Sequence, residues 1–286
     1  MPNLLRRHKK DAPKVNHQQR AQGVLSDDSP FNVVEAYKNA RTNLMFLRNS
    51  DECQKIAVTS TIAEEGKSTN CVNLAITLGQ NGLKVLIIDC DMRKPTIHKE
   101  FGLHQNDGLS EFLAGITDTQ NGIVRKTKYQ NVYVLPSGKI PPNPAELLAS
   151  KRMKALLDKL SGYFDYIIMD TPPVTLVTDA AVLKDYVQGY IMIVRAERTT
   201  IDELKECVSR MKQLDANIIG FMLNDMNYKS GSQYKHYNNY YYYRYSRYGY
   251  HEYVDDGQKD DVRSDIGLTD EASGKAAAKK DVSDLK

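Results

Sequence analysis

The sequence predicts an α/β domain with a doubly wound, mostly parallel sheet and disordered polar segments at both ends. Three observations support this prediction: a glycine-containing loop after an apolar run, two further apolar runs that end in aspartates, and a regular alternation of strand-like and helix-like segments. The length of 286 residues suits one such domain with tails. We divide the chain into a basic arm at 1–29, a domain at 30–226, a tyrosine-rich segment at 227–253 and a C-terminal segment at 254–286.

The basic arm is expected to be flexible, and either solvated or weakly attracted to an anionic membrane surface. A helical pattern follows from Phe31. Along one side of this helix, Glu35, Lys38 and Arg41 form a charged stripe. The stripe is either exposed, with ion pairs inside the helix, or a contact between subunits. The pattern alone does not choose between the two.

The segment from Thr61 to Thr69 joins the first apolar run to a helical pattern, which is the context of a phosphate-binding loop. Gly66 would let the backbone approach a phosphate at the positive end of the helix. Lys67 would reach the outer phosphates, and the Ser68 hydroxyl could bind Mg²⁺. The full pattern has a glycine where this chain has Thr61, so a helix start without a ligand is the alternative. The expected ATP contacts in the loop are Ala63, Glu64, Glu65, Gly66, Lys67, Ser68 and Thr69.

Two later apolar runs end in acids, at Asp89 and Asp91 and at Asp170. Continuous Val- and Ile-rich runs are typical of buried parallel strands, whose C-terminal ends meet at the ligand crevice. A single acid there is usually a turn or cap residue. Three carboxylates close together repel one another unless a cation lies among them. The aspartates are therefore predicted to converge on the phosphates.

The rest of the chain continues the alternation. Strands are expected near 55–60, 84–90, 131–135, 165–170, 189–195 and 217–223, and helices near 31–49, 67–81, 108–115, 144–160, 178–186 and 200–213. A proline-rich loop precedes the helix at 144–160, with Asn143 as its expected cap and Pro144 in its first turn. Arg195 and Asn224, at the ends of the last two strands, are candidate adenine contacts by position only.

After the last strand, eleven of the chain's 18 tyrosines lie in a stretch with almost no aliphatic residues, which predicts disorder. They are Tyr228, Tyr234, Tyr237, Tyr240, Tyr241, Tyr242, Tyr243, Tyr245, Tyr248, Tyr250 and Tyr253. The stretch is a low-complexity linker, a nucleic-acid arm or a set of phosphoryl acceptors. The balance of acids and bases disfavours nucleic acid as a partner. A tether raises the local concentration of acceptors at a nucleotide site.

The charges that develop during phosphoryl transfer to a tyrosine suggest a role for each candidate residue. Lys67 and Mg²⁺ would neutralise the phosphate oxygens. A tyrosine phenol is protonated at neutral pH, so a carboxylate must accept its proton, and Asp89 is the candidate. Ser68 and Asp170 are the candidate Mg²⁺ anchors, with Asp91 binding directly or through water.

Composition limits the alternatives. The formal charge of +3 implies no polyanionic partner by itself. The four cysteines are widely spaced and suggest neither a zinc site nor a disulfide framework. No apolar run approaches the length of a membrane span, and the basic N-terminus lacks the apolar region of a signal peptide. A reducing cytoplasm fits this composition.

At this point the chain closely resembles the bacterial tyrosine kinases of capsule and exopolysaccharide synthesis, the BY-kinases, over roughly residues 30 to 253. The Walker A, A′ and B segments and two further features support the resemblance. These are Gly66-Lys67-Ser68-Thr69, Ile-Ile-Asp89-Cys90-Asp91-Met92-Arg93, Ile-Ile-Met-Asp170-Thr171-Pro172-Pro173, Pro141-Pro142-Asn143-Pro144 with Glu146-Leu147-Leu148, and the tyrosine cluster.

The resemblance implies a P-loop kinase that uses ATP and Mg²⁺ to phosphorylate its own tail in trans, between subunits of a ring. It implies a cytoplasmic location at the inner face of the membrane, with a transmembrane activator and chain-length modulator and a phosphotyrosine phosphatase as partners. The stripe resembles the family's ring contact Glu-x-x-Arg-x-x-Arg. Lys38 replaces the middle arginine and loses its bidentate pairing. In the phosphate loop, Ala63-Glu64-Glu65 replaces a sequence richer in proline and glycine.

Three rival functions share this fold. Partitioning and positioning ATPases carry a signature lysine where this chain has Ile62. Iron-protein reductases need a pair of cluster-binding cysteines that the sequence does not suggest. An ATP-gated scaffold whose tail recruits partners is the non-enzyme alternative, and the presence of phosphotyrosine would separate it from a kinase.

Overall fold

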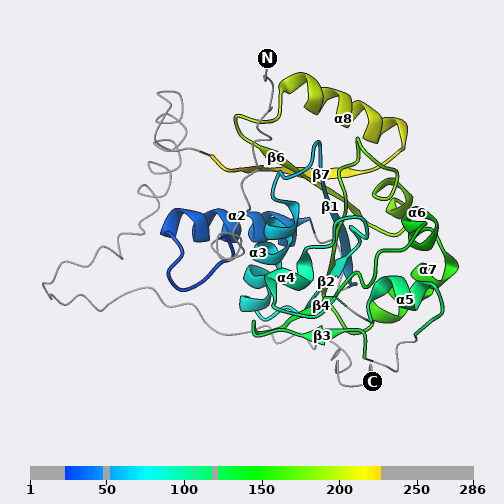
Figure 1. The fold of residues 1–286 in the computed structure, drawn as a ribbon. Helices are drawn as coiled ribbons and strands as arrows, with labels where there is room; N and C mark the ends of the chain where they lie inside the picture. The colour runs from blue at the N-terminus through cyan, green and yellow to red at the C-terminus, as the bar shows by residue number, and fades with distance from the viewer. Residues whose placement is uncertain (1–22, 48–51, 106, 118–121, 227–286) are drawn as a thin grey trace, which may run out of the picture. The chain divides into compact units, whose positions relative to one another are not determined.

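The structure is a computed structural model that describes residues 23–47, 52–105, 107–117 and 122–226. Seven strands form a sheet in the order β3-β4-β2-β5-β1-β6-β7 (Figure 1). The strands are β1 (Gln54–Ser60), β2 (Val85–Asp89), β3 (Arg125–Lys126), β4 (Val132–Leu135), β5 (Tyr166–Asp170), β6 (Gly189–Arg195) and β7 (Ile218–Asn224). All neighbours pair in parallel except β3 and β4, which are antiparallel at one edge. The predicted doubly wound α/β fold is confirmed, and β3 is a strand that the sequence pattern missed.

Helices cover both faces of the sheet (Figure 1). The helices are α2 (Phe31–Phe46), α3 (Lys67–Gln80), α4 (Ile97–Glu100), α5 (Leu109–Leu113), α6 (Pro144–Leu148), α7 (Lys151–Leu160) and α8 (Ile201–Gln213), with a 3₁₀ turn, η2 (Ala181–Leu183). Successive strand residues point to opposite faces, so they alternate between two apolar clusters. Leu86 and Ile88 pack with residues of α5, α7 and α8, whereas Val85 and Ile87 pack with α2, α3 and α4.

The segment before α2 and α2 itself pack on α3. Residues 23–29, which we expected to belong to a flexible arm, include the buried Val24 and Leu25. The Leu25 N–H donates to the Asn73 Oδ1 of α3 at 2.8 Å. The packed region therefore begins before the predicted domain start at residue 30. The arm below residue 23 and the predicted segments at 227–253 and 254–286 lie outside the described residues.

Two helix predictions were wrong in part. The helix expected at 144–160 is two helices, because Ser150 adopts an extended conformation and its side chain caps α7 by accepting the Met153 N–H at 3.2 Å. Pro144 does start α6, but the Asn143 side chain does not cap the backbone and instead donates to Glu146 Oε2 at 2.7 Å. The Ser150 cap shows a side chain competing for the backbone at a helix start, whereas Asn143 bonds another side chain.

The helix expected at 178–186 is only the short turn η2. The Ala180 carbonyl accepts from the Tyr190 hydroxyl of β6 at 2.7 Å and from the Leu183 N–H at 3.3 Å. Just before it, the fully buried Asp179 accepts two hydrogen bonds from one edge of the Arg93 guanidinium, from Nε at 2.8 Å and from Nη2 at 3.0 Å. These long-range contacts replace the continuous helix that the local pattern favoured. α4, which was not predicted, follows Pro95 and Thr96.

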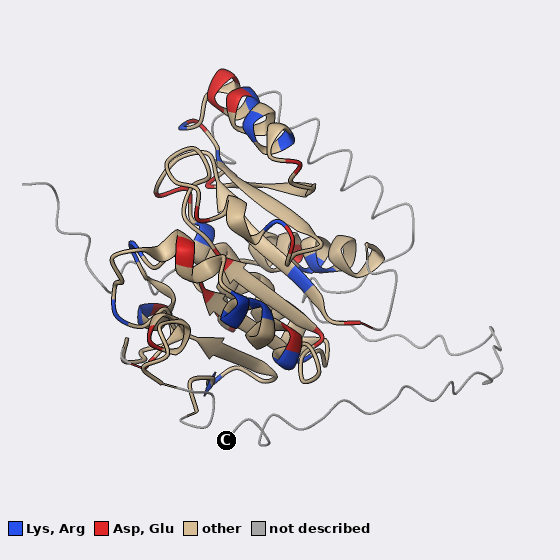
Figure 2. Cartoon of the chain, turned by 90° about the vertical axis from the view of Figure 1, so that its right-hand side faces the viewer, with Lys and Arg blue, Asp and Glu red and all other residues tan. Residues whose placement is uncertain are grey.

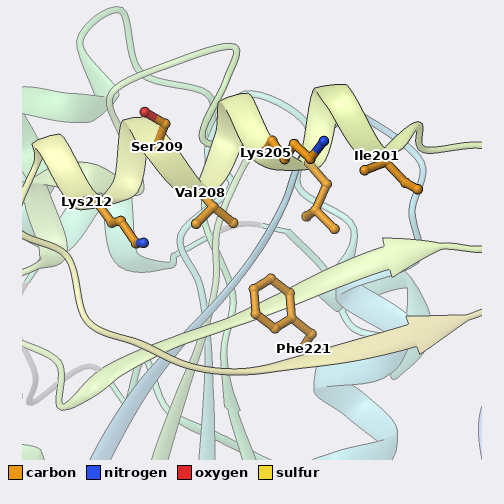
Figure 3. Close-up of a pocket in the computed structure, with 7 residues that line it drawn as sticks. Ile201, Lys205, Val208, Ser209, Lys212 and Phe221 are labelled. Atoms are coloured by element: carbon orange, nitrogen blue, oxygen red, sulfur yellow. The ribbon is translucent and has the colours of Figure 1, made fainter.

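The surface of the described part of the chain shows mixed charges and one groove. Figure 2 shows acidic and basic residues side by side along the helices. A groove of about 430 Å³ lies between α8 and β7, where Val208 and Lys212 face Phe221 (Figure 3). None of the residues that line this groove belongs to the predicted site. Among the described helices, none is long and apolar enough to cross a membrane.

Candidate functional site

The phosphate loop runs from the end of β1 at Ser60 to the start of α3 at Lys67. Gly66 precedes α3 with a φ of +89°, in the left-handed region that favours glycine. A Cβ at this position would lie 2.2 Å from the Asn224 Nδ2 of β7. Conformation and close packing therefore both require a glycine here. Ala63 lies in the loop and Thr69 in the first turn of α3.

The Glu65 side chain holds the loop in shape from inside. Its Oε2 accepts the Ile62 N–H at 2.7 Å, and its Oε1 accepts the Arg195 N–H at 3.0 Å and the Thr199 hydroxyl. Glu65 is fully buried. We expected Glu65 among the ATP contacts, but this carboxylate is already occupied by the loop and by the end of β6. Only its backbone remains for a phosphate.

The candidate adenine contacts also hold the loop. The Asn224 amide donates to the Glu65 carbonyl at 2.8 Å. The Arg195 guanidinium forms an ion pair with Asp225 at 2.5 Å and donates to the Glu64 carbonyl at 3.3 Å. The Glu64 side chain is exposed. The structure thus gives Asn224 and Arg195 a role in positioning the loop, and their contact with adenine stays a prediction.

The three aspartates meet beside this loop at the C-terminal edge of the sheet. Asp89 of β2 and Asp170 of β5 are register partners, and Val58 of β1 pairs with Asp170 from the other side. Both aspartates are fully buried, and Asp91, two residues after Asp89, is 9% exposed. The strand register therefore brings together the acids that the sequence predicted to converge.

Burial raises the pKa of all three carboxyl groups. The pKa of Asp170 rises to about 6 because of burial, while the Lys67 charge and the Ser68 hydroxyl oppose the increase. The pKa of Asp89 rises well above its ordinary value, first through burial and then through the charges of Asp170 and Asp91. The pKa of Asp91 also rises through burial, opposed by the Lys94 N–H and by Lys67. Additional positive charge at this edge would favour the ionised forms.

Each aspartate has a different set of partners. Asp170 Oδ2 accepts the Ser68 hydroxyl at 2.5 Å. Asp89 Oδ2 accepts the N–H groups of Thr96 and Ile97 at 3.2 Å, while its buried Oδ1 has no hydrogen-bond partner among the described residues. A buried carboxylate oxygen without a partner is costly and points to a group that would occupy it.

The side chains present suit a magnesium ion held partly by phosphates. Within the described ranges, no three His, Cys, Asp or Glu side chains form a metal site by themselves. Magnesium usually takes one or two carboxylates and completes its coordination with substrate phosphates and water. The oxygens of Ser68, Asp91 and Asp170 are hard ligands of that kind. The unpartnered Asp89 oxygen lies at the same edge.

The charged stripe of α2 is divided in the structure. Lys38 and Glu35 form an ion pair at 2.7 Å within the helix. The Arg41 guanidinium instead donates to the Thr77 carbonyl of α3 at 3.2 Å. These are contacts inside one chain, and none of them tests the predicted subunit contact.

Two further links to the loop escaped the sequence reasoning. From α2, the Tyr37 hydroxyl donates to Asn70 Oδ1 at 2.9 Å, and the Asn70 amide donates to the Gly66 carbonyl at 2.9 Å. From the segment before α4, the Thr96 hydroxyl donates to the Ser68 hydroxyl at 2.7 Å. The only local signal for Thr96 is its position just after the acid-rich segment and Pro95.

Comparison with known proteins places this chain in a family. The AAA domain family matches residues 53–221. The chain is 34% identical over 203 residues to the tyrosine-protein kinase YwqD of Bacillus subtilis, which covers 71% of this chain and 85% of that protein. It is 36% identical over 209 residues to the tyrosine-protein kinase CpsD of Streptococcus agalactiae, covering 72% and 90%. The kinase domain of the Escherichia coli tyrosine kinase ETK matches with a TM-score of 0.66 at 32% identity, over 70% of this chain and 78% of that one.

Proposed function

This chain belongs to the bacterial tyrosine-protein kinases of capsular and exopolysaccharide synthesis, and on that basis we propose that it transfers the γ-phosphoryl group of ATP to its own tail tyrosines. The domain binds a nucleotide, as its P-loop fold implies. The observation that carries the proposal is the placement of Lys67 and Ser68 beside three buried aspartates at the edge of the sheet.

The residues would divide the work as follows. Lys67 lies at the start of α3, where its ammonium charge and the helix N-terminus would neutralise the outer phosphate oxygens. Ser68, Asp170 and Asp91 would hold Mg²⁺. When bound, this ion supplies positive charge to the phosphate oxygens. The same charge would favour the ionised forms of Asp170 and Asp89, whose pKa values are raised in its absence.

Asp89 would accept the proton of the attacking phenol. The tyrosine oxygen forms a bond to the γ-phosphorus, the bond from that phosphorus to the bridging oxygen of ADP breaks, and the phenolic proton moves to a carboxylate oxygen. Asp89 Oδ1 suits this step because it has no hydrogen-bond partner among the residues that the structure describes, while Oδ2 is fixed by the backbone at Thr96 and Ile97.

The proposed acceptors are the eleven tyrosines between 228 and 253, within the proposed tail segment 227–253. They follow a proposed kinase domain that ends at residue 226 and precede a C-terminal segment at 254–286. We propose that one subunit phosphorylates the tail of another in a homo-oligomeric ring. Glu35, Lys38 and Arg41 are the proposed ring contact, although the Glu35–Lys38 ion pair would first have to exchange its partner. Such surface pairs are worth only a few tenths of a kcal/mol, so exchange is cheap.

The remaining partners follow from family membership. We propose activation by the cytoplasmic end of a transmembrane protein, which would bring the kinase to the inner face of the membrane. A phosphotyrosine phosphatase would reverse the modification. The phosphorylation and dephosphorylation of the tail would regulate polysaccharide synthesis and chain length.

Mass spectrometry of the tail tests the kinase proposal directly. The intact chain and Lys67→Met are incubated with Mg·ATP, with and without peptides from candidate activators. Phosphotyrosine confined to 228–253 and absent from Lys67→Met is expected. Nucleotide binding without phosphotyrosine under any condition would favour the scaffold, and phosphate release alone would favour a plain ATPase.

A mixing experiment tests transfer between subunits. The acceptor is Lys67→Met with its tyrosines intact, and the donor carries an intact loop with all eleven tail tyrosines changed to phenylalanine. Phosphotyrosine on the Lys67→Met chain requires transfer in trans. If only unmixed wild-type protein becomes phosphorylated, the transfer takes place within one chain.

A further inference from the structure

Thr96 contacts both parts of the predicted site, the phosphate loop and the aspartates. Its hydroxyl donates to the Ser68 hydroxyl of the phosphate loop at 2.7 Å. Its backbone N–H donates to Asp89 Oδ2 at 3.2 Å. Ser68 in turn donates to Asp170 Oδ2 at 2.5 Å. Thr96, Ser68 and Asp170 therefore form a continuous chain of hydrogen bonds from the segment before α4 to the end of β5.

Proton counting fixes the direction of this chain. An ionised carboxylate accepts hydrogen bonds and cannot donate them, so the Ser68 proton must point at Asp170. A serine hydroxyl carries one proton and two acceptor lone pairs. With its proton committed to Asp170, the Ser68 oxygen meets Thr96 as an acceptor, and the Thr96 proton occupies one lone pair. One lone pair of Ser68 is left for a further ligand.

The Thr96 hydroxyl does not cap α4, as a threonine at this position usually does, but bonds Ser68. Thr96 lies at the N-cap position of α4, where a threonine side chain normally accepts a backbone N–H of the first turn. Here the side chain makes no capping hydrogen bond. The hydroxyl instead points at Ser68. A purely local role at the helix start therefore does not account for its orientation.

We propose that Thr96 is a positioning residue that orients the Ser68 hydroxyl so that its remaining lone pair faces the divalent cation of the nucleotide complex. This inference rests on the proposed function, in which Ser68 binds Mg²⁺. Outer partners of this kind fix the orientation of a metal ligand, and their loss typically lowers metal affinity by about 10- to 100-fold. Without the Thr96 hydroxyl, Ser68 keeps its hydrogen bond to Asp170, but the directions of its lone pairs are no longer fixed.

The test separates metal binding from catalysis. Calorimetry measures the affinity for an imido analogue of ATP, which cannot transfer its γ-phosphoryl group, once with Mg²⁺ and once with EDTA. The ratio of the two affinities reports the contribution of the cation. Thr96→Val, which is nearly isosteric but lacks the hydroxyl, should lower this ratio about tenfold and leave the affinity in EDTA unchanged. Thr96→Ser keeps the hydroxyl and should restore the wild-type ratio.

A control variant removes a comparable hydroxyl elsewhere. The Thr127 hydroxyl donates to the Val132 carbonyl at 2.8 Å at the β3 edge of the sheet. Thr127→Val should leave the ratio unchanged. Thermal unfolding without nucleotide shows whether each variant is folded.

The outcomes distinguish this inference from the proposed function. An Mg²⁺-dependent ratio in the wild type that is unchanged in Thr96→Val overturns the role of Thr96 and leaves the kinase proposal standing. A higher ratio in Thr96→Val would also overturn it, because Thr96 would then be competing with the cation for Ser68. If the wild-type chain binds the nucleotide equally well with Mg²⁺ and with EDTA, the proposal of a magnesium site at Ser68 is itself overturned.

Discussion

Replacing Gly66 by alanine should destabilise the domain by about 2–3 kcal/mol, and a matched glycine separates the two causes. Gly66 and Gly82 have φ values of +89° and +84°. In this region an L-residue costs about 1–2 kcal/mol, and both substitutions incur that cost. At Gly82 the new Cβ would meet nothing within 4 Å.

At Gly66 the added carbon also displaces a hydrogen-bonded neighbour. The new Cβ would lie 2.2 Å from Asn224 Nδ2, which donates to the Glu65 carbonyl at 2.8 Å. Moving this amide away loses that bond, at about 1 kcal/mol. The expected difference between Gly66→Ala and Gly82→Ala is therefore about 1 kcal/mol in the free energy of unfolding.

Urea unfolding followed by circular dichroism measures this difference, since the chain contains no tryptophan. The extra cost at Gly66 should disappear in an Asn224→Ala background, where the clash is relieved and the bond is already lost. Equal midpoints for Gly66→Ala and Gly82→Ala would refute the reasoning. So would an extra cost that persists in the Asn224→Ala background.

Two further predictions concern buried carboxylates. The pKa of Asp170 is raised from 3.8 to about 6, so the folded, nucleotide-free domain binds this proton more tightly than the unfolded chain does, and stability falls as the pH rises from about 4 to about 6. Asp170→Asn should remove that part of the pH dependence and raise the melting temperature at pH 7. If the melting temperatures of the two proteins change with pH by the same amount between pH 4 and 7, the assignment to Asp170 is contradicted. Arg93→Ala leaves the fully buried Asp179 without its bidentate partner and should cost about 2 kcal/mol, less than the roughly 3–5 kcal/mol typical of breaking a fully buried pair, because the Arg93 side chain is half exposed. The exposed Lys154–Asp158 pair supplies the control, since Lys154→Ala should change the urea midpoint little, and similar effects of the two variants would argue against a special cost at Asp179.

The sequence predicts the parts of this fold that depend on neighbours along the chain. Strands buried on both faces must be continuously apolar, so Val85–Asp89 and Tyr166–Asp170 are recognisable without a structure. Parallel pairing then places Asp89 next to Asp170, as their register shows. The glycine before α3 follows from the same local logic.

The elements that escaped prediction depend on residues far apart in the chain. The turn at Ala181–Leu183 follows from the hydrogen bond between Tyr190 and Ala180 and from the Arg93–Asp179 pair, whose members are 86 positions apart. Glu65 was expected to face the nucleotide because it lies in the loop. Its carboxylate instead accepts the Arg195 N–H, 130 positions away. No periodicity in the sequence encodes such contacts.

The end of β7 forms a wall of the phosphate loop and is also the point from which the tyrosine segment departs. Asn224 packs against Gly66, and Asp225 forms an ion pair with Arg195 beside Glu64. A truncation meant to remove only the proposed acceptor tyrosines must therefore end after Asp225. Cutting two residues earlier would loosen the nucleotide loop, and the loss of activity would be mistaken for a loss of substrate. Asn224 and Asp225 thus help to shape the phosphate loop and are also the last residues of the domain before the tyrosine segment begins in the sequence.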